Sequence, residues 1–339
     1  MIKMKKIKLG VIYGGVSTEH EVSVNSANGV CEALDKEKYD IYKIYITKEG
    51  IWYHEDSVID DVFAYLKSLD VVFPILHGKY GEDGTIQGLF EIIGVPYVGC
   101  KVMSSSLGMD KVYAKMVFDK VGINTAKGIY IKRIKDRYYY IDSNFNEEEL
   151  SLDSIADLVN DKLSLPVFIK PSRSGSSVGI NKAKTKEELV KYIDYASLFD
   201  NKILIEENII GREIECAVLG NDEVNASLLG EILPNEDFYS YNAKYISSAK
   251  TIIVDDISDD IVNEIRNTAI KAYKSLDCSG LSRVDFFLEK GTDKIILNEI
   301  NTMPGFTSIS MYPQLWESSG LSYSKLLDKL IFLALDDEK

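Results

Sequence analysis

The chain has 339 residues, 45% of them hydrophobic, and carries a formal net charge of −14. At roughly 100–200 residues per domain, a chain of this length is expected to form two or three domains. The acidic balance excludes nucleic acid and anionic membranes as expected partners, because their phosphates would repel the protein. No stretch approaches the ~20 apolar residues that cross a bilayer. The short basic N-terminus lacks the apolar region of a signal peptide, so the cytoplasm is the expected location.

The four cysteines lie far apart in the sequence, without a CxxC pair or a nearby histidine pair: Cys31, Cys100, Cys216 and Cys278. Such spacing indicates reduced thiols and argues against a disulfide framework or a zinc site. We therefore expect these cysteines to have a structural role.

The first hundred residues alternate strand-like and helix-like patterns. Apolar runs predict strands over 7–13, 41–46 and 71–76, and apolar residues at helical spacing between 22 and 34 predict a helix. Strands that alternate with helices pair in parallel, so the pattern predicts an α/β fold. The glycine-rich loop 78–84 follows the third strand, where open parallel sheets bind their ligands.

A second unit is expected from 101 to 211 and a third from 212 to 339. In the second, the patterns predict a helix over 112–121 and strands over 166–170 and 203–206. The charged, tyrosine-rich stretch 131–150 is interpreted as an exposed connection of uncertain structure. In the third, we expect a helix over 261–276, strands over 281–288 and 294–300 joined by a turn at 290–293, and a closing helix over 322–335.

The two strands of the third unit carry the most informative cluster. Arg283 and Asp285 lie two apart on the first strand, and therefore on one face of it. Glu299 and Asn301 do the same on the next strand. If the strands pair, two carboxylates and an amide oxygen converge, which suits one or two Mg²⁺ ions that bridge nucleotide phosphates. The alternative is a surface salt bridge, which the glycine-containing turn 302–305 makes less attractive because its N–H groups can bind an anion.

A second cluster is the loop KPSRSGSSVG at 170–179. A strand delivers Lys170 to a run of Gly and Ser that can surround phosphates with N–H and hydroxyl donors. The loop is neither a Walker A motif nor GxGxxG. Its alternative is an ordinary Ser/Gly surface turn. Lys111, in Met-Asp-Lys, can add a second phosphate-binding cation or can be an ordinary lysine at the start of a helix.

Two glycine loops in the first unit complete the set. GGVSTEHEVS at 14–23 joins a strand to a helix N-terminus, which attracts carboxylates and phosphates. The alternative is a helix cap by Ser17 or Thr18. His77 precedes three glycines in seven residues, a pattern that indicates unusual backbone angles or a closely bound ligand. Taken alone, a histidine in a loop is more often structural.

Seven motifs in order resemble the D-alanine–D-alanine ligase family within the ATP-grasp superfamily. They are GGVSTEHEVS, HGKYGEDGTIQG, Met-Asp-Lys, KPSRSGSSVG, Ala-Lys-Tyr at 243–245, SRVDFF and NEINTMPGFTSISMYP. The resemblance covers nearly the whole chain. It implies an ATP-grasp fold in which an N-terminal Rossmann-like parallel-sheet domain (1–100) binds substrate. A central subdomain (101–211) then carries the phosphate loop, and a C-terminal subdomain (212–339) carries the Mg²⁺ site and a lid. The connection 131–165 is longer than the resemblance leads us to expect.

The resemblance also implies a role for individual residues. For ATP, phosphate-loop and nucleotide contacts fall on Lys111, Lys170, Ser177, Glu206 (near the adenine) and Glu213 (near the ribose). Asp285, Glu299 and Asn301 are expected to bind Mg²⁺, with two ions expected and Mn²⁺ as a substitute. The first D-alanine is expected at Glu19 (ammonium) and His77 (carboxylate), and the second D-amino acid at Lys244, Ser310 and Met311. Arg283 and the Gly305 N–H are expected to stabilise an oxyanion, and Ser176 and Tyr245 to join Glu19 in closing the site.

The implied reaction is ATP-dependent ligation of two D-alanines through an acyl phosphate, for the peptidoglycan of the cell wall. Such an intermediate hydrolyses in water, so a lid is needed, and the polar segment 235–250 suits one. The resemblance also suggests a homodimer. A D-alanine–D-serine ligase shares all the motifs, since a pocket rejects one added hydroxyl only weakly. A different ATP-grasp ligase and a nucleotide-binding module without activity are the remaining alternatives, and Glu19, Arg283 and Tyr245 argue against the latter.

Overall fold

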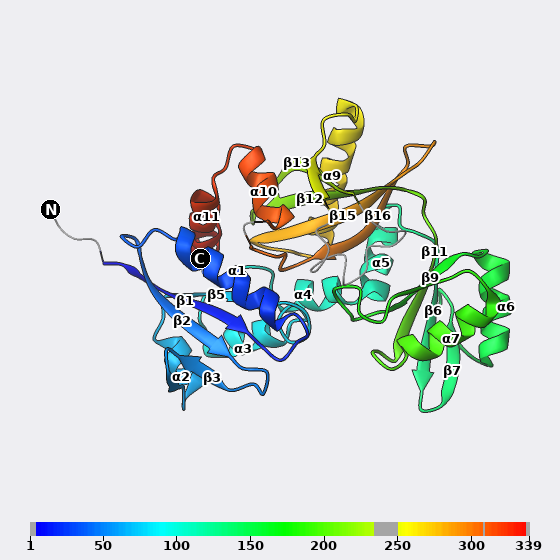
Figure 1. The fold of residues 1–339 in the computed structure, drawn as a ribbon, viewed down its shortest axis with the longest axis horizontal. Helices are drawn as coiled ribbons and strands as arrows, with labels where there is room; N and C mark the ends of the chain where they lie inside the picture. Colours follow the sequence, from blue (N-terminus) through cyan, green and yellow to red (C-terminus); the bar gives the residue numbers. More distant parts are fainter. Residues whose placement is uncertain (1–4, 234–249, 308, 337–339) are drawn as a thin grey trace.

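A computed structural model describes residues 5–233, 250–307 and 309–336. It contains three β-sheets that succeed one another along the chain, each with its own helices (Figure 1). The mixed α/β architecture expected from the sequence is confirmed. None of the helices among these residues is long and apolar enough to cross a membrane.

The N-terminal sheet has the strand order β4-β3-β2-β1-β5. Strands β1 (Ile7–Gly14), β2 (Tyr39–Ile46) and β5 (Val71–Ile75) are parallel, as the alternating pattern predicted. The antiparallel hairpin of β3 (Trp52–His54) and β4 (Ser57–Val58) extends one edge. The accompanying helices are α1 (His20–Ala33), α2 (Val62–Lys67) and α3 (Thr85–Ile93). The glycine loop that begins at Gly78 therefore leaves the carboxyl edge of a parallel sheet.

The central sheet has the order β10-β9-β11-β6-β7-β8 and follows two helices, α4 (Val102–Met109) and α5 (Lys111–Lys120). Its strands are β6 (Gly128–Ile134), β7 (Arg137–Ile141), β8 (Glu147–Leu150), β9 (Val167–Pro171), β10 (Asn181–Ala183) and β11 (Lys202–Glu207). Helices α6 (Leu152–Lys162) and α7 (Lys186–Ala196) cover one face, and their apolar residues join the buried core of the sheet.

The interpretation of residues 131–150 as an exposed connection was wrong. The stretch forms most of three antiparallel strands, β6, β7 and β8. Ile131 is fully buried and Tyr138 nearly so, and both belong to the core beneath α6 and α7. On β6, the buried Ile129 and Ile131 alternate with more exposed residues, which gives that strand one buried and one more exposed face. The many tyrosines and charged residues of this stretch hide the alternation in the sequence.

The C-terminal sheet has the order β14-β13-β12-β15-β16. Its strands are β12 (Gly211–Leu219), β13 (Asn225–Leu233), β14 (Lys250–Ile253), β15 (Leu281–Glu289) and β16 (Ile295–Asn301). β15 and β16 are antiparallel neighbours, so the expected hairpin is confirmed. Ile214, Cys216 and Val218 face helix α9 (Asp259–Ser275). The alternate residues of β12 and β15 lie on the opposite face, where the site is built.

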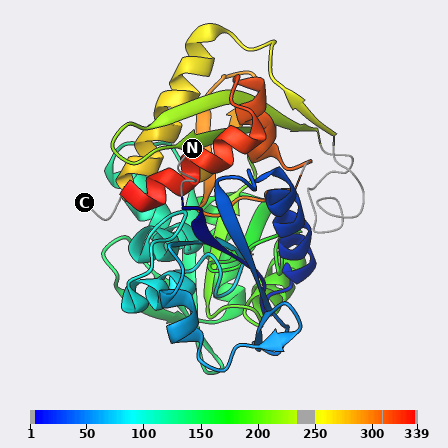
Figure 2. The ribbon, with the colours of Figure 1, turned by 90° about the vertical axis from the view of Figure 1, so that its left-hand side faces the viewer.

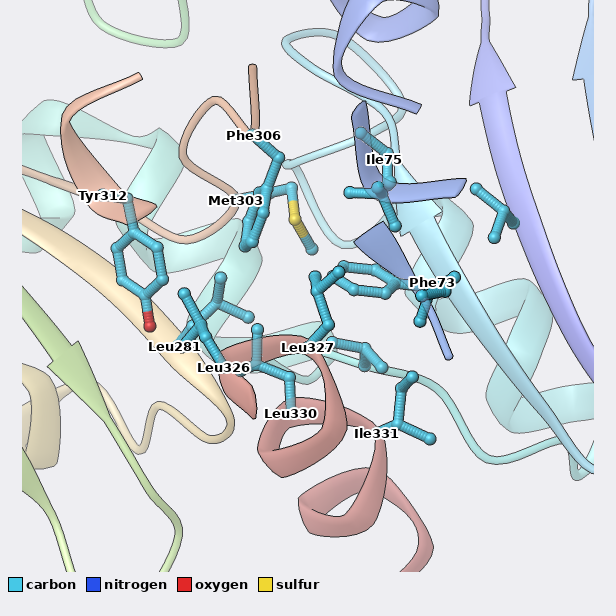
Figure 3. Packing of buried hydrophobic residues seen from close by; sticks show 14 of the residues in the cluster. Phe73, Ile75, Leu281, Met303, Phe306, Tyr312, Leu326, Leu327, Leu330 and Ile331 are labelled. Carbon is cyan, nitrogen blue, oxygen red and sulfur yellow. The ribbon is translucent and has the colours of Figure 1, made fainter. Parts of the chain in front are cut away.

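A shared core joins the N-terminal sheet to the end of the chain. Figure 3 shows Phe73 and Ile75 of β5 facing Met303, Phe306 and the last helix. That helix, α11 (Tyr323–Asp336), packs on β5 and α1, while α10 (Met311–Ser318) packs on β12 and β13 (Figure 2). Burying a side chain of this size contributes about 1.5–3 kcal/mol. This core therefore fixes the loop after β5 beside the turn after β16. All four cysteines are buried and unbridged.

Candidate active site

Two adjoining cavities lie where the three sheets meet. The first, of about 340 Å³, lies among the loops at 19 and 77, β15, and the turn after β16. The second, of about 470 Å³, lies between the central and C-terminal sheets. Six residues line both cavities, so the two spaces meet there: Lys111, Ser174, Ser176, Glu215, Ile232 and Glu299.

The structure brings the sequence-predicted residues together around these cavities. Those in the first are Glu19, His77, Lys111, Ser176, Arg283, Glu299, Asn301, Gly305, Ser310 and Met311. Those in the second are Lys111, Lys170, Ser176, Ser177, Glu206, Glu213, Asp285 and Glu299. The remaining two, Lys244 and Tyr245, lie outside the described residues, as does most of the segment 235–250 expected to form a lid.

A buried ion triad joins the central sheet to α5, and two of its members, Lys170 and Glu206, line the second cavity. The Lys170 ammonium lies 2.6 Å from one oxygen of Glu206, and Lys115 lies 2.7 Å from the other. Burial disfavours a charged carboxylate, but the two lysines outweigh it and lower the pKa of Glu206 to about 2. Burial likewise opposes the Lys170 charge, and Glu206 more than offsets it, so the pKa of Lys170 is raised. The Lys170 ammonium therefore presents a fixed positive charge to the second cavity.

Lys111 connects the phosphate loop to the C-terminal sheet. Its ammonium donates to the Ser174 carbonyl at 2.9 Å and lies 3.2 Å from Glu299. Its backbone N–H donates to the Ser172 carbonyl at 3.0 Å. Helix α5 begins at this residue, capped by the Asp110 side chain, which also accepts a hydrogen bond from the Ser172 hydroxyl at 2.7 Å. The lysine is thus held where the two cavities meet.

The serine loop turns into the site through two residues with left-handed backbone angles. Ser176 and Ser177 have φ values of 49° and 58°, which turn the chain sharply. Arg173 fixes the start of the loop by a pair of hydrogen bonds to Asp200. At its tip, the Ser176 hydroxyl donates to the Glu19 carboxylate of the N-terminal unit. The loop therefore spans the space between the central and N-terminal units.

The pairing of β15 and β16 builds the acidic cluster that the sequence predicted. Asp285 lies opposite Glu299, and Arg283 lies opposite Asn301. Arg283 donates twice to Asp285, with both distances 2.7 Å, and the Asn301 amide donates to Asp285 at 2.9 Å. The asparagine therefore keeps its own carbonyl oxygen available as an acceptor.

This donor set suits Mg²⁺. Among the described residues no three His, Cys, Asp or Glu side chains are gathered closely enough to hold a metal by themselves. Mg²⁺ does not need such a cage, since it is commonly held by one or two carboxylates together with waters and substrate phosphates. Asp285 and Glu299 supply two carboxylates, and Asn301 supplies an amide oxygen, beside the lysines of the second cavity.

Glu19 and His77 form the other wall of the first cavity. Glu19 immediately precedes helix α1, without a capping hydrogen bond to its side chain, and is buried. A Cβ at Gly78 would lie 2.5 Å from its carboxylate, so only glycine allows the loop to approach it. The His77 ring lies 3.9 Å from the Glu82 carboxylate and 3.2 Å from the Met303 carbonyl. Burial opposes the charge on His77, but Glu82 and then Glu19 outweigh it and raise the pKa of the ring.

The turn after β16 closes the cavity from the C-terminal side. Gly305 has no room for a Cβ, which would lie 2.9 Å from the Ser310 hydroxyl oxygen. That hydroxyl accepts from the Thr307 N–H at 3.0 Å, and the Phe306 N–H donates to Ser26 at 3.3 Å. Met311 begins α10 and packs against Gly230 of β13. The backbone of the turn is therefore held rigidly at the cavity edge.

Four residues of the site were not singled out from the sequence: Glu82, Lys115, Glu215 and Asn298. Lys115 and Asn298 hold Glu206 and Lys170, respectively. Lys115 lies four residues after Lys111, one helical turn along α5, which was an available signal. Glu215 lies two residues after Glu213, and therefore on the same face of its strand. Neither spacing reveals the partner across the fold.

Comparison with known proteins places this site in a family. A model described as D-ala D-ala ligase C-terminus matches residues 138–332, and one described as D-ala D-ala ligase N-terminus matches 8–65 and 59–100. The D-alanine--D-alanine ligase of Acetivibrio thermocellus is 47% identical, over 97% of this chain and 96% of the relative.

Two solved structures are similar over nearly the whole chain. The VanG D-Ala:D-Ser ligase from Enterococcus faecalis is 39% identical with a TM-score of 0.83, over 97% of this chain and 100% of that one. The D-alanine--D-alanine ligase from Bacillus anthracis complexed with ATP is 28% identical with a TM-score of 0.78, over 98% and 100%. Fold and site together define an ATP-grasp ligase. The chain belongs to the D-alanine–D-alanine ligase family, as its seven motifs indicated.

Proposed function

We propose that the protein joins two molecules of D-alanine, converting ATP to ADP and phosphate, to supply D-alanyl-D-alanine for peptidoglycan. One observation carries this proposal beyond family membership: the two cavities meet at Lys111 and Glu299. A nucleotide in the second cavity can thus present its terminal phosphate to a carboxylate bound in the first. Lys111 and Lys170 line the second cavity. Such cations suit phosphoryl transfer, since its catalysis is mainly positioning and charge stabilisation.

In the second cavity, Lys111, Lys170 and Ser177 bind the phosphates of ATP. Glu206 lies toward the adenine and Glu213 toward the ribose, the positions that family resemblance gives them. Asp285, Glu299 and Asn301 would hold one or two Mg²⁺ ions, for which Mn²⁺ could substitute. When bound, the metal neutralises phosphate oxygens and so favours attack at the terminal phosphorus. The charge of Lys170, which Glu206 holds at 2.6 Å, supports this assignment.

In the first cavity, Glu19 binds the ammonium of the first D-alanine, and protonated His77 lies near its carboxylate. One oxygen of that carboxylate attacks the terminal phosphorus, the bond to the bridging oxygen breaks, and ADP leaves. The product is D-alanyl phosphate, a mixed anhydride. Glu82, 3.9 Å from the ring, supports the charge on His77.

The amine of the second D-alanine, once deprotonated, attacks the acyl carbon. Negative charge develops on the acyl oxygen, where the Arg283 guanidinium and the Gly305 N–H stabilise it. The tetrahedral intermediate then expels phosphate and leaves the peptide bond. Ser310 and Met311 line the first cavity, and we assign them to the second substrate, as the family resemblance implies. Lys244 and Tyr245, which complete this set by resemblance, lie outside the described residues.

D-serine as the second substrate is the alternative that a specific observation favours. The VanG D-Ala:D-Ser ligase shares the fold with a TM-score of 0.83 and 39% identity. The higher identity of 47% to a D-alanine--D-alanine ligase supports D-alanine here. A further ATP-grasp ligase with other acids and amines fits less well, because Glu19 and His77, which the resemblance assigns to an amino acid, both line the first cavity. A homodimer and a cytoplasmic location accompany the proposal.

The experiment that tests the chemistry uses D-alanine whose carboxylate carries a heavy oxygen isotope. If the carboxylate attacks ATP, one labelled oxygen per turnover appears in the released phosphate, and the dipeptide forms in equal amount. Release of unlabelled phosphate alongside dipeptide would exclude an acyl phosphate. The absence of any D-alanine-dependent phosphate release would remove the substrate assignment and leave the ATP-grasp fold.

A further inference from the structure

Three carboxylates form a row across neighbouring strands of the C-terminal sheet. Glu215 of β12 lies opposite Asp285 of β15, and Asp285 lies opposite Glu299 of β16. Residues directly opposite share one face of the sheet, where like charges repel. Glu215 is the most deeply buried of the three, with 5% of its side chain exposed. Such a row is stable only when cations lie between its members.

Arg283 is the cation that serves two members of this row. Its Nε and Nη2 donate to the two oxygens of Asp285, each at 2.7 Å. The same Nη2 lies 3.2 Å from Glu215 Oε1. Burial disfavours the charge on Arg283, but Asp285 and then Glu215 outweigh it and hold the pKa of the guanidinium well above its usual range. The arginine is thus held from two sides.

The two carboxylates differ in what else they must do. Both oxygens of Asp285 are occupied by Arg283, yet Asp285 is also assigned to the metal. A metal ion bound to an Asp285 oxygen would repel the Arg283 guanidinium and weaken its hydrogen bonds to that carboxylate. Glu215 lines both cavities, but the metal assignment does not include it. It can therefore keep its contact with Arg283 while Asp285 changes partner.

We propose that Glu215 is a positioning residue that holds the Arg283 guanidinium at the wall of the first cavity when Asp285 binds the metal. This inference rests on the proposed ligase function. Glu215 contacts neither reacting atom and acts through Arg283, whose charge stabilises the acyl oxygen in the second step. Without the glutamate, the guanidinium would follow Asp285 or swing into the cavity, and the acyl phosphate would be lost to water.

The test compares Glu215→Gln with Glu231→Gln as a matched control. Glu231 is also buried, on the adjacent strand β13, and pairs with Arg212 at 2.6 Å, but it lines neither cavity. We expect Glu215→Gln to lower kcat by about ten- to a hundredfold, because misplacing an oxyanion stabiliser costs less than removing it, which lowers kcat by about a hundred- to a thousandfold. KM for ATP should change by less than about threefold, and phosphate release should exceed dipeptide formation. The control should lose stability but keep kcat and coupling.

Two further measurements separate positioning from a structural role. In a double-mutant cycle, Glu215→Gln should add little to the loss of kcat caused by Arg283→Lys, because both substitutions act through the Arg283 guanidinium. The rise in melting temperature that Mg²⁺ gives the ADP complex should need more Mg²⁺ in Glu215→Gln, since Arg283 then competes harder for Asp285. If Glu215→Gln does not fold, Glu215→Asp, which keeps the charge, takes its place.

Each outcome decides the matter. Wild-type kcat and equal yields of phosphate and dipeptide in Glu215→Gln would overturn the proposal, as would fully additive losses in the cycle. If neither variant folds, Glu215 is structural and the proposal falls. The proposed function fails separately, through a wild-type protein that forms no dipeptide from D-alanine and ATP.

Discussion

The Ser176 hydroxyl donates a hydrogen bond to the Glu19 carboxylate, joining residues 157 positions apart in the chain. Glu19 starts helix α1 of the N-terminal unit, whereas Ser176 stands at the tip of the phosphate loop of the central unit. One contact thereby links the place proposed for the first D-alanine to the loop that would cover the ATP phosphates. The two substrates can therefore be enclosed together.

Replacing Ser176 by alanine should weaken this closure. A hydrogen bond to a charged group is worth about 1.5–3 kcal/mol, so KM for the first D-alanine should rise about tenfold or more. The loosened loop should also admit water to the acyl phosphate, so that phosphate release exceeds dipeptide formation. Steady-state kinetics with both products measured checks this. Unchanged KM and equal product yields would show that the hydroxyl does not close the site.

Replacing Asp285 by asparagine should weaken metal binding. The variant keeps the size of the side chain but removes one of two carboxylates from the proposed ligand set. Turnover should fall sharply, by about a hundredfold or more as for other removed charge stabilisers, and should recover in part as Mg²⁺ is raised. A titration of activity against Mg²⁺ measures the change. Wild-type turnover at saturating Mg²⁺ would take Asp285 out of the ligand set.

The charge on His77 predicts a pH dependence for the binding of the first D-alanine. Its pKa is raised above 6.5 despite burial, because Glu82 and Glu19 favour the protonated ring. A raised folded pKa means that the stabilisation is complete below 6.5 and is lost as pH rises through the folded value. KM for D-alanine should accordingly rise in the alkaline range. His77→Gln should show a higher KM and lack this component, and an identical pH profile in the variant would refute the role.

The triad around Glu206 predicts a pH-dependent contribution to stability. The pKa of Glu206 is depressed from 4.5 to about 2. Its contribution is therefore fully present above 4.5 and disappears as pH falls through about 2. Glu206→Gln leaves Lys115 and Lys170 without their shared counter-charge, so its melting temperature should be lower near neutral pH. The difference from the wild type should shrink below pH 4.5. A gap that stays constant down to pH 3 would contradict the depressed pKa.

The sequence predicted those parts of the fold whose patterns are local. Parallel strands such as β1 and β5 are buried on both faces and read as continuous apolar runs, so they were found with nearly correct bounds. The strands β6 to β8 were missed because the stretch is rich in charged residues and tyrosines, which suggested exposure. Tyrosines such as Tyr138 are nevertheless buried. Helix α4 was also missed, since its serines and a glycine are poor helix formers.

The residues of the site likewise fall into those that the sequence predicted and those that it did not. Residues in contiguous motifs, such as Lys170 and Asp285, could be predicted from the sequence. The structure places both of these at the second cavity. Lys115 and Glu215 could not be predicted, because their significance lies in partners 91 and 68 residues away along the chain: Glu206 for the first and Arg283 for the second. The meeting of the cavities at Lys111 and Glu299 is a tertiary property that no spacing encodes.

The most direct measurement of the central claim is phosphate release from ATP and Mg²⁺ with D-alanine, D-serine or D-lactate, with product masses determined in parallel. The proposed function predicts that D-alanine alone supports release and yields a dipeptide of two D-alanines in equal amount, with D-serine a poor second substrate. Efficient formation of D-alanyl-D-serine would instead make the protein a D-alanine–D-serine ligase. No stimulation by any of the three would contradict the proposed reaction.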